Sequence, residues 1–554
     1  MSSMKAGEII KRCVRFVAFV VVCNATSATA QSTLCSDRLN FQPATTPNAI
    51  GWQKFPEFRL PFPVVYGGPR LNEPALEPLR HGFSHLTVVR PDEGPQMTPA
   101  RQAIEFYGLA YGLNQPWETL ESPWGNDLNA YRAKWDQWLR DHSAGQNAAG
   151  KWVPGFTVLM VDIERVLETD AQILRLKTNT QTPADLRQLP DAQFLERYKR
   201  DMTTLYADAV RYLRERADFS NVRVTSYSDV PIRNTYLNVV GNTWQDWSTN
   251  VARTSFLFRD PATGQPGGPF AEQLDFLQPS GYYYYDYPSP LAPDYLAYLL
   301  FQVEANRAWS QKPVWPIVWM RYHDCCGSHP KFIQPFMAEA TAIFPFFSGA
   351  RGLWLWEVPN FRDAERPMAA YEHFIHGLYR LSKFADMFEG TYELVIATPA
   401  RDLMDKHLPV WRGVFKANKL LIAAQNPYAA DGAQTTVEVS YKNWSTTITL
   451  TGREVYLCQY DLSLTGLEPA PLSGLTISPN PALTKTTLTF NALGSGTVDV
   501  QLLDVTGRLV KQQSLQTSPG RMRLDLDTAS LPAGLYIVRL LDGKTAVQEK
   551  LMIE

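Results

Sequence analysis

The hydrophobic and polar positions in the first part of the chain alternate between strand-like and helix-like patterns. Over residues 31–389, short apolar runs are separated by longer stretches, and residues 192–217 carry apolar side chains at helical spacing with charges on the opposite face. Eight apolar runs follow one another: PFPVVYGG, SHLTVVRP, AIEFYGLAYG, GFTVLMVDIE, VRVTSYSD, LDFLQPSGYYYY, VWPIVWMRY and GLWLWE. Strands that alternate with helices are typical of an α/β fold, and eight of them predict a (β/α)8 TIM-like barrel. AIEFYGLAYG is the weakest of these strands, because Ala and Glu suit a helix equally well, and without it a seven-stranded or distorted barrel remains.

The rest of the chain has a different pattern, with short alternating runs bounded by turn residues. Runs such as ELVIATP, TTVEVSY and STTITL, between residues 390 and 466, predict an accessory β-sandwich. Runs such as TTLTF, TVDVQLLD and MRLDLD, between residues 472 and 554, predict a second one. The predicted fold class is therefore an α/β barrel followed by two all-β sandwich domains.

Residues 1–30 have the pattern of a Sec signal peptide. A basic stretch ends at Arg15, an apolar run covers residues 16–22, and the small-x-small sequence Ala-Thr-Ala follows at residues 28–30. We expect cleavage before Gln31. The apolar run is too short to span a bilayer, and no later run reaches about 18 apolar residues, so no transmembrane anchor is predicted.

Composition narrows the possible functions. Charged residues make up 19% of the 554 residues, aromatic residues 12%, and the formal net charge is −2, so electrostatic attraction to nucleic acid is not expected. The sequence contains no P-loop, no GxGxxG after a strand, no HExxH and no GxSxG, which leaves nucleotide, nicotinamide, zinc-protease and ordinary esterase chemistry without support. We therefore expect no organic cofactor. We also expect the protein to be a monomer.

The cysteines of the exported chain are Cys35, Cys325, Cys326 and Cys458. They are too few for a disulfide scaffold in a chain of this length, although an exported protein can pair some of them. One alternative is a bond between the adjacent Cys325 and Cys326, and the other joins one of these two to Cys35. A metal site is not predicted, since no second CxxC or HxxxH accompanies this pair.

The strand GFTVLMVDIERV ends in two acidic residues. Side chains alternate along a strand, so Asp162 and Glu164 share a face with Val158 and Met160. If that face is the barrel interior, two carboxylates lie side by side at the mouth, where active sites of such barrels are found. Like charges at close range oppose simultaneous ionisation, so we expect one of them, Glu164 at the strand tip, to keep a proton and act as a general acid. The alternative is a simple ion pair with Arg165 or Arg321.

The last run, GLWLWEVPN, offers another carboxylate. Glu357 lies on the face opposite Trp354 and Trp356 by strand parity. Either Glu357 points into the mouth as a second catalytic carboxylate, or the strand twists at its end and Trp356 floors a binding site.

Aromatic residues gather at other strand ends. Because sugar rings present apolar faces that stack on aromatic side chains while their hydroxyls bond polar groups, an aromatic mouth with carboxylates suits a glycan. Asp229, which closes VRVTSYSD, is either a substrate ligand or the N-cap of a helix. The candidate substrate-binding residues are Tyr283, Tyr285, Trp319, Arg321, Tyr322, Trp356 and Asp229.

The last segment also carries four motifs in order. These are PNP at residues 479–481, DVTGRLV at 504–510, LPAGLYIVRL at 531–540 and the terminal KLMIE. Residues 472–554 thereby resemble the C-terminal sorting domain of the type IX secretion system of Bacteroidetes-like bacteria. The resemblance implies the secretion machinery as a partner, and a secreted or cell-surface location.

Three strand ends of the barrel, VDIE, SGYYYYDY and GARGLWLWE, resemble those of the hyaluronidase family of glycoside hydrolases. This resemblance implies that Glu164 is the proton donor and that Asp162 orients a 2-acetamido group of the substrate as internal nucleophile. It also implies that Tyr283, Tyr285 or Tyr322 braces that group. The sequence departs from the family at Ile163, where the family has Trp, and lacks its usual cysteine pattern.

Together, these patterns predict a secreted glycoside hydrolase that cleaves an extracellular polysaccharide or glycan. In one mechanism Glu164 is the acid/base and Glu357 the nucleophile, and in the other Asp162 and Glu164 assist the substrate's own acetamido group. The alternative function is a glycan-binding surface protein without catalysis.

Overall fold

The computed structural model describes most of the chain from residue 32 onward. The residues outside the description are 1–31, 37, 72, 75, 120, 165–168, 228, 234–238, 263, 265, 324–330, 359–360, 364, 443, 463–471, 493–495, 519 and 543–545. The predicted leader, Arg165, Cys325 and Cys326 therefore lie outside the described residues.

Each of the eight apolar runs contributes one segment to a parallel arrangement of strands. The segments are β2 (Val64–Gly67), β3 (His85–Leu86), β4 (Ala103–Phe106), β7 (Val158–Val161), β8 (Arg223–Ser226), residues 277–283, β9 (Ile317–Trp319) and β10 (Leu353–Trp356). Two parallel sheets, ordered β3-β2-β10-β9 and β4-β7-β8, contain the named strands. A parallel bridge between Leu86 and Gln102 joins the first sheet to the start of β4.

The segment 277–283 lies along β9 and its flanking residues. Parallel bridges join Ser280 to Ile317 of β9, Leu277 to Val314 before this strand, and Tyr283 to Tyr322 after it. On its other side, Asp275 N donates to Val224 O of β8 at 2.7 Å. This part of the chain is thus an α/β domain whose parallel strands all end on one side.

The ambiguous run AIEFYGLAYG is a strand in its first part. β4 pairs in parallel with β7 from Ala103 opposite Val158 to Phe106 opposite Val161. A 3-10 helix follows at Tyr107–Leu109. Local propensity does not distinguish a strand from a helix in this run. The pairing with β7 selects the strand, in which the side chains of Ala103 and Phe106 are buried.

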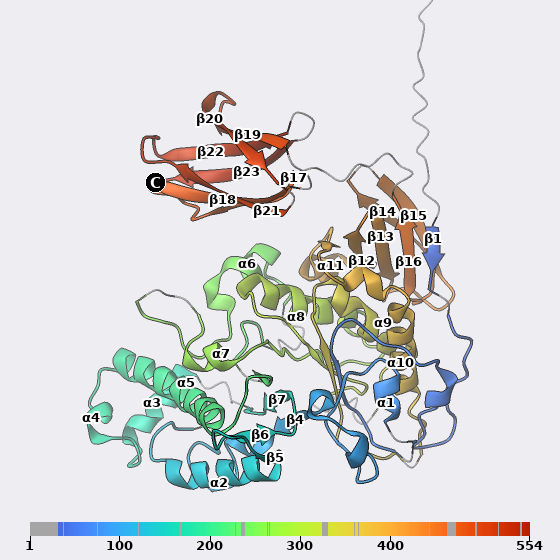
Figure 1. Cartoon of the computed structure of the whole chain (residues 1–554), viewed down its shortest axis with the longest axis vertical. Helices are drawn as coiled ribbons and strands as arrows, with labels where there is room; N and C mark the ends of the chain where they lie inside the picture. The colour runs from blue at the N-terminus through green and yellow to red at the C-terminus, as the bar shows by residue number, and fades with distance from the viewer. Residues whose placement is uncertain are drawn as a thin grey trace, which may run out of the picture.

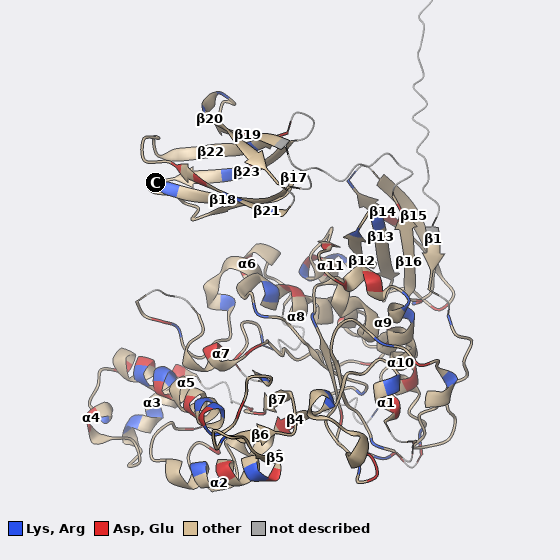
Figure 2. Ribbon diagram, viewed as in Figure 1, with Lys and Arg blue, Asp and Glu red and all other residues tan. Residues whose placement is uncertain are grey.

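Helices surround these strands. The predicted helix over 192–217 is α5 (Asp191–Arg216), and Figure 2 shows acidic and basic residues along α5 and along α2 (Leu128–Asp141). On α5 they form exposed i,i+4 pairs such as Arg197 with Asp201. The remaining elements of this part are α1 (Glu77–Arg80), β5 (Ser143–Gln146), β6 (Trp152–Pro154), α3 (Asp170–Leu174), α4 (Ala184–Arg187), α6 (Trp244–Thr249), α7 (Pro269–Gln273), α8 (Tyr295–Trp309), α9 (Pro335–Phe347) and α10 (Ala369–Ser382).

The next part is built from antiparallel strands. A sheet ordered β1-β16-β13-β12-β11 and the hairpin β14-β15 contribute to one hydrophobic cluster. Its elements are β1 (Ser32–Cys35), β11 (Glu393–Val395), α11 (Ala400–Lys406), β12 (Val410–Lys416), β13 (Lys419–Gln425), β14 (Gln434–Tyr441), β15 (Trp444–Thr451) and β16 (Tyr456–Asp461).

Strand β1 comes from the other end of the chain. The sequence placed it with the barrel residues 31–389, yet it pairs antiparallel with β16, beside which it is drawn in Figure 1. Cys35 forms a disulfide with Cys458, 423 positions away. The alternative in which Cys35 bonds to Cys325 or Cys326 was therefore wrong, because strand pairing, which spacing does not reveal, brings Cys35 opposite Cys458.

The final segment forms two antiparallel sheets, ordered β17-β18-β21 and β20-β19-β22-β23. Residues of both sheets share one hydrophobic cluster, separate from the others. The strands are β17 (Leu472–Ser478), β18 (Lys485–Ala492), β19 (Gly496–Asp504), β20 (Leu509–Thr517), β21 (Gly520–Asp527), β22 (Gly534–Leu541) and β23 (Ala546–Ile553).

A buried ion pair joins the α/β part to the sheet that contains β12. Glu304 of α8 accepts from Arg412 of β12 at 2.8 and 3.0 Å, and the two residues are 5% and 1% exposed. Glu304 also accepts from Ser348 Oγ and Ala400 N, each at 2.8 Å. Its carboxylate thus connects four segments of the chain.

We predict that Glu304→Ala lowers the free energy of unfolding by about 3–5 kcal/mol, because it leaves the buried guanidinium of Arg412 without its partner. Denaturant unfolding of the full chain measures this change. The control is Asp431→Ala, which breaks a pair with Arg453 in which the aspartate side chain is 96% exposed and should cost less than about 1 kcal/mol. Equal effects of the two substitutions would contradict a structural role of the buried pair.

Candidate active site

A cavity of about 210 Å³ lies where several parallel strands end. Its walls come from β4, β7, β9 and β10, from the segment 277–283, and from the residues that follow β7, β8 and β9. The lining residues are Glu105, Met160, Asp162, Glu164, Tyr227, Tyr282, Ile317, Trp319, His323 and Trp356.

Asp162 and Glu164 both line this cavity, as strand parity predicted. The alternate residues Val161 and Ile163 belong to the hydrophobic cluster under the helices. Asp162 is 7% exposed, whereas Glu164 is exposed at the mouth. The two carboxylates therefore share a face but differ in their access to solvent.

A third carboxylate, Glu105 of β4, completes the group. Glu105 lies opposite Met160 in the β4–β7 register and is therefore diagonal to Asp162. The two side chains share a hydrogen bond, and the indole N–H of Trp356 also donates to Glu105. Three acidic side chains from two neighbouring strands thus meet at one end of the sheet.

Burial and mutual repulsion raise the pKa values of two of these groups. Burial, together with the negative charges of Glu105 and Glu164, raises the pKa of Asp162 to about 8. Burial also raises the pKa of Glu105, with its hydrogen bonds to Asp162 and Trp356 acting in the opposite direction. Because a carboxyl–carboxylate hydrogen bond needs one proton, the pair holds one proton near neutral pH. The sequence led us to expect the retained proton on Glu164, whereas burial and repulsion raise the pKa values of Asp162 and Glu105 instead.

Aromatic rings form the remaining walls. Tyr282 lies with its ring centroid 5.5 Å from that of Trp319 and 6.0 Å from that of Trp356, and the two indoles meet edge to face at 4.9 Å. Tyr227 lies 6.3 Å from Tyr282, and burial raises its pKa to about 12. Such walls offer apolar faces beside a polar end, which suits the two surfaces of a sugar ring.

Glu357 lies outside this cavity. It is 1% exposed, and Trp356, the preceding residue, lines the cavity in its place. Its oxygens accept from Arg321 Nε and Nη2 at 2.8 Å, Trp319 Nε1 at 2.9 Å, Tyr371 Oη at 3.0 Å and Val358 N at 2.8 Å. Of the two alternatives for the last strand, the structure has Trp356 at the site and Glu357 in a buried ion pair with Arg321.

The Arg321 guanidinium supports the wall from behind. It lies 4.5 Å from the ring of Trp319 and 4.1 Å from the ring of Phe361. Arg362, which follows Phe361 in the chain, donates to the backbone oxygen of Arg70 at 2.9 Å. Arg321 therefore positions Trp319, and the loop that carries Phe361 connects it to a second polar network.

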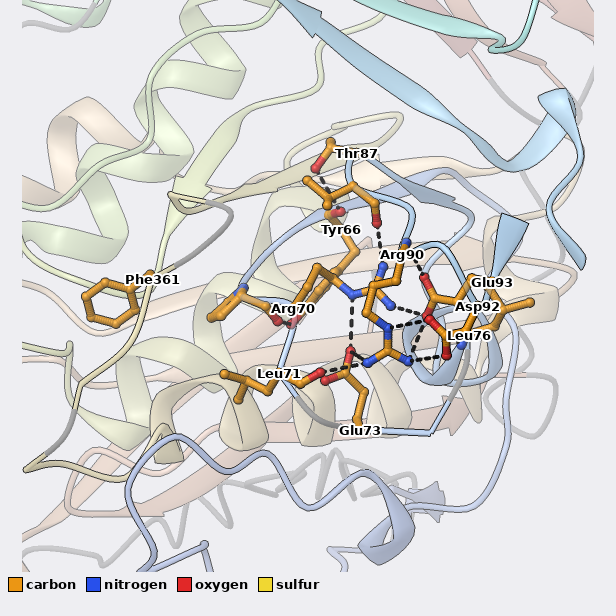
Figure 3. A network of polar contacts seen from close by, with 12 residues as sticks. Tyr66, Arg70, Leu71, Glu73, Leu76, Thr87, Arg90, Asp92, Glu93 and Phe361 are labelled. Carbon is orange, nitrogen blue, oxygen red and sulfur yellow. Dashed lines mark hydrogen bonds and ion pairs between the residues drawn. The ribbon is translucent and has the colours of Figure 1, made fainter. Parts of the chain in front are cut away.

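That second network holds the loops that follow β2 and β3 (Figure 3). Arg70, 6% exposed, pairs with Glu73 at 3.1 Å and with the fully buried Glu93. Glu93 also accepts from the backbone N–H groups of Leu76 at 3.1 Å and Arg90 at 3.0 Å. These contacts fix two of the loops at the end of the strands where the cavity lies.

The other predicted substrate ligands lie elsewhere. Tyr283 bonds Thr341 Oγ1 at 2.6 Å, and Tyr322 donates to Asp286 at 2.9 Å; both are buried, and neither lines the cavity. Tyr285 lines a separate, very small cavity. Asp229 is buried and accepts from Leu257 N at 3.0 Å, and it caps none of the described helices.

Glu105 and Tyr227 were not singled out from the sequence. One sequence feature could have identified Glu105 as a site residue. It is the only acidic residue in the apolar run AIEF, and it alternates with Ile104 and Phe106 along the strand. Tyr227 follows strand β8 directly, which is the same kind of position as Asp162 after β7.

The described residues contain no group of three or more His, Cys, Asp or Glu that could hold a metal ion. Within the same part of the chain, no helix combines the length and apolar character needed to cross a membrane.

We predict that Asp162→Asn stabilises the protein increasingly as the pH rises. Between pH 4 and 8 the folded protein keeps a proton on Asp162 that the unfolded chain releases, so this residue lowers stability as the pH rises through that range. The variant should gain at least about 1 kcal/mol over wild type at pH 8 relative to pH 4, the value of one pKa unit. Unfolding free energies across this range measure the difference.

The control for this experiment is Asp218→Asn, at a surface carboxylate whose pKa is held below its ordinary value by hydrogen bonds with Ser220. That variant should show no gain between pH 4 and 8. A difference between Asp162→Asn and wild type that stays constant with pH would contradict the raised pKa of Asp162.

Three solved structures illustrate what the chain is similar to. They are bee venom hyaluronidase (15% identity, 47% of this chain and 80% of that chain, TM-score 0.30), bee venom hyaluronidase in complex with a hyaluronic acid tetramer (14%, 41% and 66%, 0.26) and the endo-β-1,4-mannanase from Thermotoga petrophila (10%, 77% and 71%, 0.25). No curated protein matches the chain in sequence.

The sorting motifs, in contrast, are confirmed by a family model. Residues 476–554 match the secretion system C-terminal sorting domain, within the range 472–554 predicted from the motifs. Such a domain indicates a secreted or cell-surface protein. The chain therefore carries a secretion system C-terminal sorting domain behind an α/β domain with a carboxylate-lined cavity.

Proposed function

We propose that this chain is a secreted glycoside hydrolase that cleaves an uncharged, N-acetylated glycan. The observation that carries the proposal is the meeting of Glu105, Asp162 and Glu164 in a cavity walled by aromatic rings. Carboxylates with different environments provide the acid and the stabilising base of glycoside cleavage, and the rings bind the sugar.

The scaffold in this proposal is a (β/α)8 barrel, with the eight parallel segments as its strands. Residues 390–466, joined by β1, form an accessory β-sandwich, and residues 472–554 form the sorting domain, which engages the type IX secretion machinery after export through a Sec signal peptide. The position of the cavity at the ends of the parallel strands is consistent with a barrel, because active sites of (β/α)8 enzymes lie at the carboxyl ends of the strands.

In the proposed mechanism Glu164 is the general acid. In the complex with the substrate it takes up a proton from solvent, to which its position at the mouth gives access. It gives this proton to the glycosidic oxygen while the carbonyl oxygen of the substrate's 2-acetamido group attacks C1, and the bond between C1 and the leaving oxygen breaks. Glu164 then takes a proton from water, whose oxygen attacks C1 and releases the acetamido oxygen. The net reaction consumes one water, and the exposed position of Glu164 gives that water access.

Asp162 orients the acetamido group. It accepts the acetamido N–H while it shares one proton with Glu105, so the pair presents a single negative charge to a substrate that becomes positively charged at its ring. Tyr227 and Tyr282 line the cavity and replace Tyr283, Tyr285 and Tyr322 as the residues that brace the group.

The location of Glu357 favours this mechanism over the one with two catalytic carboxylates. A nucleophilic carboxylate must reach C1, but both oxygens of Glu357 are engaged by Arg321 and its neighbours behind the wall. Glu357 and Arg321 are accordingly positioning residues for Trp319.

The charge of the site favours an uncharged substrate. Glu105, Asp162 and Glu164 line the cavity, and the nearby guanidinium of Arg321 is already paired with Glu357. A uronic acid in this cavity would meet carboxylates of its own sign. Chitin-like oligosaccharides therefore fit this site better than acidic polysaccharides.

We predict that the mature protein releases reducing sugar from chitin oligosaccharides but not from mannan or xylan, and that Glu164→Gln lowers kcat at least about a hundredfold through loss of the general acid. The experiment compares chitin oligosaccharides, hyaluronan, mannan and xylan with wild type, Glu164→Gln and Asp162→Asn. The matched control is Glu57→Gln, at a glutamate whose side chain is 67% exposed and pairs only with Arg80 in a surface ion pair.

Cleavage of mannan or xylan as fast as of chitin oligosaccharides would contradict the role of the acetamido group. Glycan binding without turnover in wild type would identify the alternative, a glycan-binding protein in which the carboxylates only accept hydrogen bonds from hydroxyls.

A further inference from the structure

Tyr107 is unusual among the aromatic residues. It is 55% exposed, and it is the one aromatic side chain among the exposed large apolar residues of the described chain. It follows β4 directly and lies two positions after Glu105, which lines the cavity. An exposed ring next to a candidate active site gains nothing from folding and is typical of a binding surface.

The loop that carries Tyr107 is held firmly. Leu109 and Ala110 are fully buried, and Trp135 Nε1 of α2 donates to Leu109 O at 2.7 Å. Lys134 packs so closely under Gly112, where φ is +98°, that a Cβ there would lie 2.6 Å from its Nζ. The exposure of Tyr107 is therefore a fixed feature of the structure and not a consequence of a loosely packed loop.

A second tyrosine connects Tyr107 to the proposed general acid. The rings of Tyr107 and Tyr111 stack with centroids 4.6 Å apart and an interplanar angle of 16°. The backbone N–H of Glu164 donates to the hydroxyl of Tyr111, whose pKa burial raises to about 12. The stacked pair thus has a defined position beside Glu164.

We propose that Tyr107 and Tyr111 form the platform that binds the leaving-group sugar of the glycan. This inference rests on the proposed function. The 210 Å³ cavity is smaller than the roughly 300–1,000 Å³ of pockets that enclose a drug-sized ligand, so it holds about one sugar ring. Glu164 protonates the oxygen that joins this ring to the next one, and the next ring must lie on the exposed side of Glu164. The Tyr107 ring, backed by Tyr111, offers an exposed apolar face beside Glu164.

The platform makes turnover depend on a sugar in the leaving group. Stacking on Tyr107 holds the second ring while the bond to the first is broken, so it positions the glycosidic oxygen against Glu164. A substrate without a second ring cannot stack on Tyr107, so its scissile bond is not positioned against Glu164 in this way. The enzyme is therefore specific for oligomers and polymers over single sugars with small leaving groups.

The test compares two probes with the full chain: tetra-N-acetylchitotetraose and N-acetylglucosaminyl fluoride, whose leaving group has no ring. For Tyr107→Ala, the ratio of kcat/KM for the tetramer to kcat/KM for the fluoride should fall about tenfold, the effect of losing one ring-stacking contact. Tyr107→Phe keeps the ring and should keep the ratio. So should Leu291→Ala, which removes a side chain that is 41% exposed elsewhere.

A ratio that stays at the wild-type value in Tyr107→Ala, with both probes hydrolysed, would overturn the platform and leave the proposed function standing. If wild type hydrolyses neither probe, the proposed function fails, and calorimetry with the tetramer decides about the platform. A tenfold weaker affinity in Tyr107→Ala would support it, whereas equal affinity, or no binding by wild type, would overturn it.

Discussion

The pairing of β4 with β7 is the constraint on which the rest of the site depends. In this register Glu105 lies diagonal to Asp162, and because both are largely removed from water, ionisation of both carboxyl groups is unfavourable near neutral pH. They share a proton by a hydrogen bond, and Glu164, two residues beyond Asp162 and past the end of β7, lies at the solvent-exposed mouth. One strand pair thereby creates two chemical environments for three residues of the same kind, which is what acid catalysis next to a stabilising base requires.

The wall opposite these acids is held by an ion pair that never reaches the cavity. Glu357 neutralises Arg321, accepts from Trp319, and leaves the rings of Trp319 and Trp356 facing the cavity. Burying this pair costs desolvation energy, which its many hydrogen bonds offset. The benefit is a rigid aromatic surface, and rigidity matters because a sugar ring must be held within a fraction of an ångström of the acid.

The sequence predicted local features well and pairings poorly. Each of the eight apolar runs contains one of the parallel segments described above, and strand parity placed Asp162 and Glu164 on one face, since both inferences depend only on neighbours along the chain. Glu105 was missed because a single acid in a short strand has no meaning until the strand beside it is known. The partner of Cys35 was mistaken for the same reason, since β1 crosses to β16 from the other end of the chain. The separation of Glu357 from the site likewise follows from Arg321, which parity alone does not position.

The central claim is that Asp162 and Glu105 share a proton near neutral pH, and infrared difference spectroscopy of the free protein tests it most directly. The account predicts a protonated-carboxyl band at pH 7 that disappears on titration with a midpoint near pH 8, is absent in Asp162→Asn, and titrates at lower pH in Glu105→Gln, because that variant removes a neighbouring negative charge. A wild-type spectrum at pH 7 without a protonated-carboxyl band assignable to Asp162 or Glu105 would contradict it.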